Sequence, residues 1–260
     1  MITVRTKAEL REALAGRGDS AVGLVPTMGA LHEGHLALIR AAREECDLVV
    51  ATSFVNPAQF GEQADLDAYP RDPDADVRVA AEGGVDVLFV PPVAEVYPPG
   101  FATWVEPGGA AVGLEGERRP GHFRGVATVC LKLFNLVRPD RAYFGRKDAQ
   151  QVAVIKQLVR DLDLDLELEI RVVPTVRDAD GLAISSRNVR LSADDRRRAL
   201  AIHRALETRD PDRARTELAD AGLEPEYVAV ADLDGPTLAV AVHVGSTRLI
   251  DNVQLEGDPA

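Results

Sequence analysis

The hydrophobic and polar positions of the first 173 residues follow two alternating periods. Short apolar runs predict buried strands, and segments with apolar residues every three or four positions predict amphipathic helices. The predicted strands are Val22–Val25, Leu48–Val55, Val85–Val90, Arg141–Phe144 and Leu166–Val173. The predicted helices are Gly34–Glu45, Asp74–Glu82, Arg124–Val137 and Ala149–Leu162. This alternation is typical of a parallel sheet with helices on both faces, so we predict an α/β, Rossmann-like nucleotide fold.

The pattern changes after Pro174. Ser192, with Asp195 three residues later, predicts the cap of a helix that runs to about Glu207, and a shorter helical pattern covers residues 209–222. Three successive strands are then predicted at Tyr227–Leu233, Leu238–Val244 and Thr247–Ile250. Helices followed by an antiparallel meander indicate a small α+β domain.

We therefore expect a Rossmann-like domain over residues 1–181 and a small C-terminal α+β domain, serving as a lid, over residues 182–260. Residues 91–123 form the one long irregular stretch, with scattered Gly and Pro, and we interpret it as a functional loop or a lid. Within that stretch, Glu115 and His122 either support a site or are merely exposed, and we favour the second interpretation. The single tryptophan, Trp104, is expected to pack in the core.

Composition narrows the possible classes of protein. With 260 residues, 46% of them hydrophobic, the chain can bury a sizeable core. A formal net charge of −12 argues against nucleic acid or an anionic membrane as the main partner. Cys46 and Cys130 are far apart and predict buried free thiols in a reducing compartment. Since the N-terminus is unlike a signal peptide and no apolar run is long enough to span a membrane, we expect a cytoplasmic protein.

The stretch from Pro26 to His35 reads PTMGALHEGH and lies between a predicted strand and a helix that begins near Gly34. Free backbone N–H groups and the positive end of the helix dipole make such a turn an anion site. His32 and His35 can donate hydrogen bonds to phosphate oxygens there, so the stretch predicts binding of a nucleotide triphosphate. A surface pair of histidines or a helix cap explains these residues equally well when they are taken alone. A zinc site lacks a second ligand pair at the usual spacing.

Two further polar clusters follow predicted strands. Asn56 and Gln59 come after the second strand and can face a ligand, although a turn with amide caps explains them as well. In the turn that begins at Gly145, Lys147 is placed to reach β- and γ-phosphates, and Asp148 can bind a ribose hydroxyl or cap the next helix. A solvated charged turn is the alternative there.

The polar loop at residues 176–188 contains two adjacent serines followed by Arg187. It can close over a triphosphate, because the guanidinium offers a fork of donors. An interdomain linker explains the loop if it is taken alone. Because the clusters around His32, Asn56 and Lys147 all follow strand ends, where ligands of parallel sheets bind, a common site is favoured over any single cluster.

These motifs resemble those of the pantothenate synthetase family, the ATP-dependent ligases that join pantoate to β-alanine. The resemblance covers almost the whole chain. It is strongest over Val25–Leu38, Phe54–Gly61, Asp67–Arg71, Arg119–Pro139, Gly145–Gln151 and Asp180–Asn188. The paired histidines alone are less specific, because cytidylyltransferases, adenylyltransferases and class I aminoacyl-tRNA synthetases share them.

The resemblance implies a role for each matching residue. It assigns ATP binding to Met28, Gly29, His32, Gly34, His35, Gly145, Lys147, Asp148, Val176, Ile184, Ser185, Ser186 and Arg187. The implied catalytic residues are His35, as proton donor, with His32 and Lys147. Gln59 and Gln151 match the pantoate-binding glutamines, and Gln59 is also assigned to β-alanine. No residue is assigned to a metal, since Mg²⁺ is expected to arrive on the triphosphate with few protein ligands.

The implied reaction has two steps. The pantoate carboxylate attacks the α-phosphorus of ATP to give pantoyl-adenylate and pyrophosphate, and the amine of β-alanine then expels AMP. The family resemblance also implies a homodimer. Rival interpretations are a nucleotidyltransferase, a tRNA ligase, for which the acidic chain lacks a basic surface, and a nucleotide-binding module without catalysis.

The chain departs from the family pattern in the phosphate turn and in the C-terminal region. Arg146 and Ala149 stand where the family usually has a glutamate and an aromatic residue. The reversed charge would tighten triphosphate binding, slow pyrophosphate release or point to solvent, and the missing ring would loosen packing behind the helix. The segment between Leu191 and Tyr227 is short, so we expect a smaller lid.

Overall fold

The computed structural model describes residues 1–61 and 63–256, which form two compact units. The first unit comprises Met1–Phe144 and Val154–Val173. The second comprises Gly145–Ala153 and the chain from Pro174 onward. The boundary predicted after residue 181 falls inside the second unit, and the division into two domains stays a prediction.

The first unit is built on a six-stranded sheet with the order β1-β4-β3-β2-β5-β6. Its strands are β1 (Ile2–Val4), β2 (Val22–Val25), β3 (Leu48–Thr52), β4 (Val87–Phe89), β5 (Arg141–Gly145) and β6 (Glu169–Val173). The pairs β1–β4, β4–β3, β3–β2 and β2–β5 are parallel. All four residues of β2 are buried, as expected of a strand covered on both faces. The Rossmann-like prediction is confirmed.

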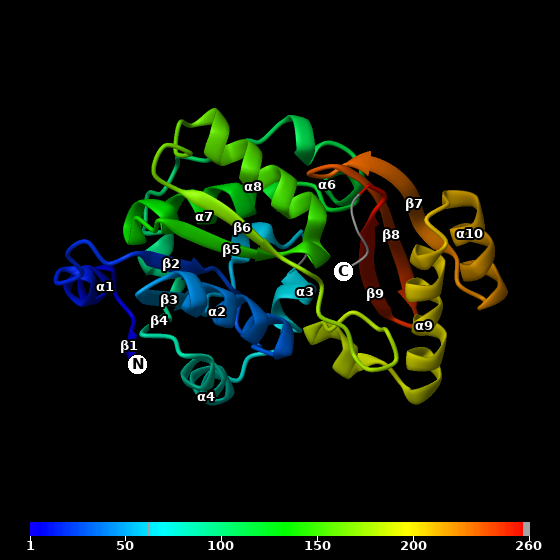
Figure 1. Ribbon diagram of the computed structural model, residues 1–260, viewed down its shortest axis with the longest axis horizontal. Coiled ribbons are helices and arrows are strands. Elements are labelled where there is room, and N and C mark those ends of the chain that lie inside the picture. The colour runs from blue at the N-terminus through cyan, green and yellow to red at the C-terminus, as the bar shows by residue number, and fades with distance from the viewer. Residues whose placement is uncertain (62, 257–260) are drawn as a thin grey trace. The chain divides into compact units, whose positions relative to one another are not determined.

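Helices cover both faces of this sheet. Figure 1 shows α2 (Glu33–Glu45) and α4 (Pro73–Gly83) on one side and α7 (His122–Val137) on the other. Helix α1 (Lys7–Leu14) contacts α7. Apolar residues of α2, β3, β4 and β5 form one core cluster, which includes Ile39, Ala42, Val49, Leu88 and Tyr143. Both cysteines are buried free thiols, as predicted.

Several expected boundaries are wrong. The strand predicted over residues 166–173 is shorter, because residues 163–168 form turns before β6. The irregular stretch at residues 91–123 contains short helices: α5 (Val93–Val96), η2 (Gly109–Ala111) and α6 (Leu114–Arg118). Strand β1 and the short helix α3 (Gln63–Asp67) were not predicted. Only one of the three residues of β1 is buried, and a helix of five residues is too short to show an apolar period.

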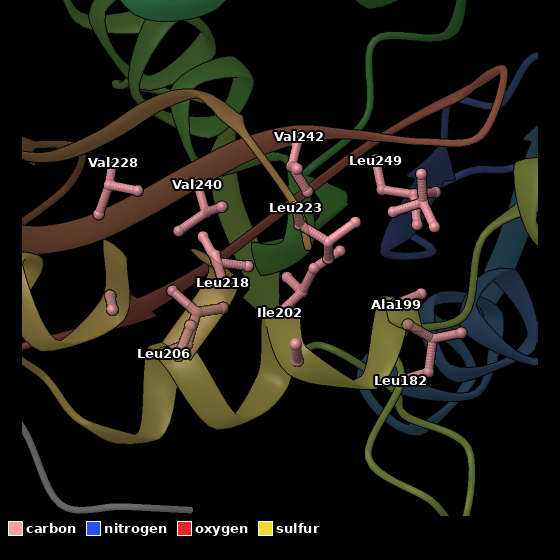
Figure 2. Packing of buried hydrophobic residues seen from close by; sticks show 14 of the residues in the cluster. Leu182, Ala199, Ile202, Leu206, Leu218, Leu223, Val228, Val240, Val242 and Leu249 are labelled. Carbon is pink, nitrogen blue, oxygen red and sulfur yellow. The ribbon is translucent and has the colours of Figure 1, made fainter. Parts of the chain in front are cut away.

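The second unit has a three-stranded antiparallel sheet of β7 (Pro225–Asp232), β8 (Pro236–Val244) and β9 (Thr247–Gln254), in that order. Helices α9 (Ala193–Glu207) and α10 (Pro211–Asp220) pack against it, and Ser192 caps α9 by accepting from the Asp195 N–H, as predicted. Figure 2 shows the core between them, in which Leu206 and Leu218 face Val240. The predicted small α+β fold is confirmed.

Candidate active site

Two histidines cap helix α2. His32 is the N-cap residue, and its Nδ1 accepts a hydrogen bond of 3.1 Å from the Gly34 N–H. The Nδ1 of His35 accepts in return from the His32 N–H at 3.2 Å, and the two ring centroids lie 4.2 Å apart. Because Nδ1 is an acceptor in both rings, each neutral imidazole carries its proton on Nε2. The helix cap therefore fixes the same tautomer in both rings.

The turn before this helix is held by a buried carboxylate. Asp76 of α4 accepts from the Leu31 N–H at 2.9 Å and from the Ser53 hydroxyl at 2.7 Å. Gly29 has a φ of +79°, and a Cβ there would lie 2.6 Å from Asp76 Oδ2. Met28 forms an isolated antiparallel bridge to Ser53. Asp76 was not predicted to support a site, although an acidic residue four positions before buried Ala80, on the apolar face of a helix, was a usable signal.

The amide of Gln59 is oriented by Asn56. Asn56 Oδ1 accepts from the Ala58 N–H at 3.3 Å and from the Tyr97 hydroxyl at 2.8 Å. Burial raises the pKa of Tyr97, so its hydroxyl stays protonated and donates. Asn56 Nδ2 then donates to Gln59 Oε1 at 2.9 Å and to the Gly125 carbonyl at 3.1 Å. Because Gln59 Oε1 accepts from Asn56, the Gln59 amide can offer its Nε2–H₂ group as a donor to a ligand oxygen.

Three residues expected to have no part in such a site behave differently. Glu115 and His122 are buried, at 5% and 7% exposed, so the interpretation of both as exposed side chains is wrong. His122 Nδ1 lies 3.0 Å from the Gln59 carbonyl oxygen and packs behind that residue. Trp104 is 36% exposed and does not lie in the core. It stacks on Tyr97, because aromatic residues of the short helical loop form their own cluster.

The second unit holds the remaining predicted residues. Gly145 is the N-cap of η3 (Arg146–Asp148), and Gln151 lies in the first turn of α8 (Ala149–Asp161), partly buried. Lys147 lines a pocket together with Ser185, Arg187, Asn188, Arg248 and Asp251, among others. Lys147 is mostly buried, whereas the Asp148 side chain is 47% exposed. The structure thus brings Lys147, Ser185 and Arg187 together.

The loop at residues 176–188 has a defined structure. The Ile184 N–H donates to the Val176 carbonyl at 2.9 Å, which closes a tight hairpin. At the base of the loop, Arg177 forms a bidentate pair with buried Asp251 of β9, at 2.6 and 3.1 Å. Ser185 caps η4 (Ser186–Arg190) by accepting from the Arg187 N–H. Such anchoring is more than a plain linker needs.

Comparisons with known proteins identify the family of this chain. The sequence matches the family described as pantoate-beta-alanine ligase over residues 2–254. The chain belongs to this family. It is 53% identical to a pantothenate synthetase of Corynebacterium efficiens, covering 98% of this chain and 99% of the relative. It is 52% identical to that of Acidobacterium capsulatum, covering 94% and 89%.

Solved structures of the pantoate–β-alanine ligase family have the same fold. Pantothenate synthetase from Thermus thermophilus superimposes with a TM-score of 0.89 at 45% identity, covering 99% of this chain and 100% of that one. The Francisella tularensis ligase, complexed with beta-gamma ATP and beta-alanine, gives 0.89 at 36% identity and covers both chains fully. This similarity confirms the fold prediction over the whole length.

The two unusual residues of the phosphate turn, Arg146 and Ala149, both have defined surroundings in the structure. The Arg146 guanidinium donates to Asp234 at 2.8 Å and to the Leu233 carbonyl at 3.3 Å, both in the β7–β8 turn. Its side chain is only 18% exposed, so the interpretation that it points to solvent is wrong. Ala149 is 3% exposed and packed, so its methyl group is well enclosed at the start of α8. The adjacent Gln150 is also buried.

Proposed function

We propose that this chain condenses pantoate with β-alanine to pantothenate through a pantoyl-adenylate, releasing pyrophosphate and AMP. The observation that carries the proposal is membership of the pantoate–β-alanine ligase family over residues 2–254. The described geometry supports it, because the residue types that each step needs are present with suitable donors. The role given to each residue in binding ATP, pantoate or β-alanine is part of the proposal.

In the first step, a pantoate carboxylate oxygen attacks the α-phosphorus of ATP and pyrophosphate leaves. A carboxylate is already ionised, so the step needs donors to spread charge over the phosphate oxygens more than it needs a base. We assign this role to the Nε2–H groups of His32 and His35, to Lys147 and to the N-terminus of α2. Ser185, Ser186 and Arg187 are assigned to the triphosphate, with Met28, Gly29, Gly34, Gly145, Asp148, Val176 and Ile184 as the remaining ATP contacts.

In the second step, the amine of β-alanine attacks the acyl carbon and AMP leaves. Gln59 and Gln151 are assigned to pantoate, and Gln59 also to β-alanine. Support for Gln59 comes from its fixed amide, since Asn56 occupies Oε1 and leaves Nε2 to donate to a substrate oxygen. A neutral donor orients the attacking carboxylate without the full salt bridge that would weaken it as a nucleophile.

Mg²⁺ is proposed to enter on ATP. Among residues 1–61 and 63–256 no three His, Cys, Asp or Glu side chains are grouped to hold a metal ion. Mg²⁺ is commonly bound through substrate phosphates and water with one or two protein ligands, which is the mode proposed here. When bound, the ion neutralises charge on the triphosphate as pyrophosphate leaves. Lys147 and Arg187 are the protein cations assigned beside it.

A homodimer in the cytoplasm, without nucleic-acid or membrane partners, completes the proposal. No helix in the described part of the chain combines the length and the apolar character that crossing a bilayer requires. The acidic balance of −12 supports small-molecule substrates over nucleic acid. Sedimentation equilibrium tests the dimer, for which a mass near twice 28.0 kDa is expected.

Oxygen labelling tests the reaction. Pantoate carrying ¹⁸O in its carboxylate is incubated with ATP, Mg²⁺ and β-alanine, and the nucleotide product is analysed by mass spectrometry. Adenylate formation followed by C–O cleavage transfers one labelled oxygen to AMP. Label in inorganic phosphate, with ADP as the product, would mean an acyl phosphate and would contradict the proposal.

A further inference from the structure

Asn252 of β9 binds the backbone of the turn that carries Lys147. Its Nδ2 donates to the Arg146 carbonyl at 3.0 Å and to the Lys147 carbonyl at 2.9 Å, and its side chain is almost fully buried. One amide group thus satisfies two consecutive carbonyls of η3. Only a donor can face two carbonyl oxygens, so this contact fixes which way the Asn252 amide points.

The Arg146 side chain holds the same turn from the other side. Its guanidinium bonds the carboxylate of Asp234 and the carbonyl of Leu233, and both side chains of the ion pair are less than a quarter exposed. The β7–β8 turn that receives it is itself braced. Gln254 Nε2 donates to the Asp234 carbonyl at 2.9 Å, and the Gly235 N–H donates to Asp232.

We infer that Asn252 and the Arg146–Asp234 pair are positioning residues, which hold Lys147 at the place where it meets the phosphates of ATP. The inference rests on the proposed function. Lysine reaches its ligand on a flexible four-carbon chain, so the location of its ammonium depends on where the backbone is held. We call Asn252, Arg146 and Asp234 the clamp. Asn252 of β9 binds the peptide groups directly before and after Lys147, and the Arg146–Asp234 pair ties the residue before Lys147 to the β7–β8 turn.

The clamp gives the reversed charge at Arg146 a specific role. The Arg146 guanidinium bonds the Asp234 carboxylate and the Leu233 carbonyl within its own unit. Its charge therefore has a partner there without pointing to solvent or contacting a phosphate. A displacement of about 1 Å in a reacting group can cost roughly 100-fold in rate. Loss of the clamp is therefore expected to act on adenylation through Lys147.

The test measures the two half-reactions separately. Asn252→Asp keeps the shape but sets a carboxylate oxygen against two carbonyls. We expect pantoate-dependent ATP–pyrophosphate exchange to fall about 10- to 100-fold with a raised KM for ATP. Conversion of preformed pantoyl-adenylate and β-alanine to pantothenate should change less than about 2-fold, since the β- and γ-phosphates have left by then. In a Lys147→Ala background, Asn252→Asp should cause no further loss of exchange.

The ion pair supplies a second, independent variant set, which also serves if Asn252→Asp fails to fold. Arg146→Asp and Asp234→Arg should each slow exchange, and the double variant should recover much of it. Arg204→Ala, which breaks the Arg204–Glu217 pair between α9 and α10, is the matched control and should leave exchange unchanged.

Two results would overturn the inference and leave the proposed function standing. One is that Asn252→Asp slows both half-reactions equally, and the other is that Asn252→Asp slows exchange as much in the Lys147→Ala background as in the native chain. If both single variants fold but the Arg146→Asp/Asp234→Arg double variant does not recover exchange, the Arg146–Asp234 pair is not a positioning pair, and that part of the inference is wrong. No exchange by the native chain would overturn the proposed function itself.

Discussion

His32 and His35 each cap α2 through Nδ1, and the proposed function gives Nε2 a second task, donation to phosphate. Because each Nδ1 accepts a backbone N–H, the proton of the neutral ring is on Nε2. The helix cap, which the sequence offers as an alternative to phosphate binding, is present in the structure. The cap is compatible with the proposed phosphate binding, because it fixes the tautomer in which Nε2 carries the proton.

His35→Gln separates the two tasks. Glutamine at the third helical position can keep the reach-back bond to the N-cap backbone, so the melting temperature should stay near that of the native chain. The imidazole donor is lost, and we expect the rate of adenylation to fall at least about 100-fold. Thermal melting and AMP release measure the two effects. A fully active His35→Gln enzyme would exclude His35 from the chemistry.

Gln59→Glu tests the amide polarity at the proposed pantoate position. The new carboxylate still accepts from Asn56 Nδ2, but it offers pantoate a negative oxygen where Gln59 offers a donor. We expect kcat/KM for pantoate to fall at least about 100-fold, because a buried charge faces a like charge. Gln157→Glu in α8 is the matched control. Near-normal turnover of Gln59→Glu would contradict the assignment.

At the scale of elements, α4 supports the turn before α2 through one side chain. Asp76 accepts from the Leu31 N–H and the Ser53 hydroxyl across the sheet edge. Asp76→Ala leaves both donors without their acceptor, and we expect a loss of about 1–3 kcal/mol in the free energy of unfolding together with a raised KM for ATP. Urea unfolding and steady-state kinetics check this. Asp76→Asn keeps one acceptor and should be milder, and exposed Asp74→Ala is the control.

The antiparallel sheet of the second unit contains a pH-dependent contact. Burial alone would raise the pKa of Glu226, but Arg248 on β9 and His243 on β8 outweigh it and hold the pKa below its ordinary value. A lowered pKa adds stability above about pH 5 that is lost as the pH falls through the folded value. The stability difference between the native chain and Glu226→Gln should therefore shrink from pH 5 downward. A difference that stays constant down to pH 3 would contradict this contact.

Local patterns predicted most elements because their causes are local. The apolar run of β2, the Ser192 cap of α9 and the spacing of α2 each lie within a few residues. The partners that were missed are distant in sequence. Asp76 bonds a residue 45 positions earlier, and Asn252 bonds the Arg146 carbonyl over 106 positions. No periodicity reports such a contact, so only a structure can supply it.

For the whole molecule, the alternation of strands and helices was enough to predict the Rossmann-like fold, and motifs were enough to predict the family. Neither the alternation nor the motifs predicted that residues 145–153 belong to the second unit. Within that unit Arg146 bonds Asp234, and Asn252 bonds the Arg146 carbonyl; the sequence alone does not reveal these long-range bonds. The proposed ATP residues are consequently divided, with His32 and His35 in one unit and Lys147 and Arg187 in the other.

The central claim, that this chain activates pantoate as an adenylate before β-alanine enters, is tested most directly by ATP–pyrophosphate exchange. Purified chain is incubated with ATP, Mg²⁺ and labelled pyrophosphate, with and without pantoate, and β-alanine is omitted. We predict exchange only with pantoate, and release of AMP with pantothenate only after β-alanine is added. ATP binding without exchange under either condition would contradict the claim and indicate a nucleotide-binding module that has no ligase activity.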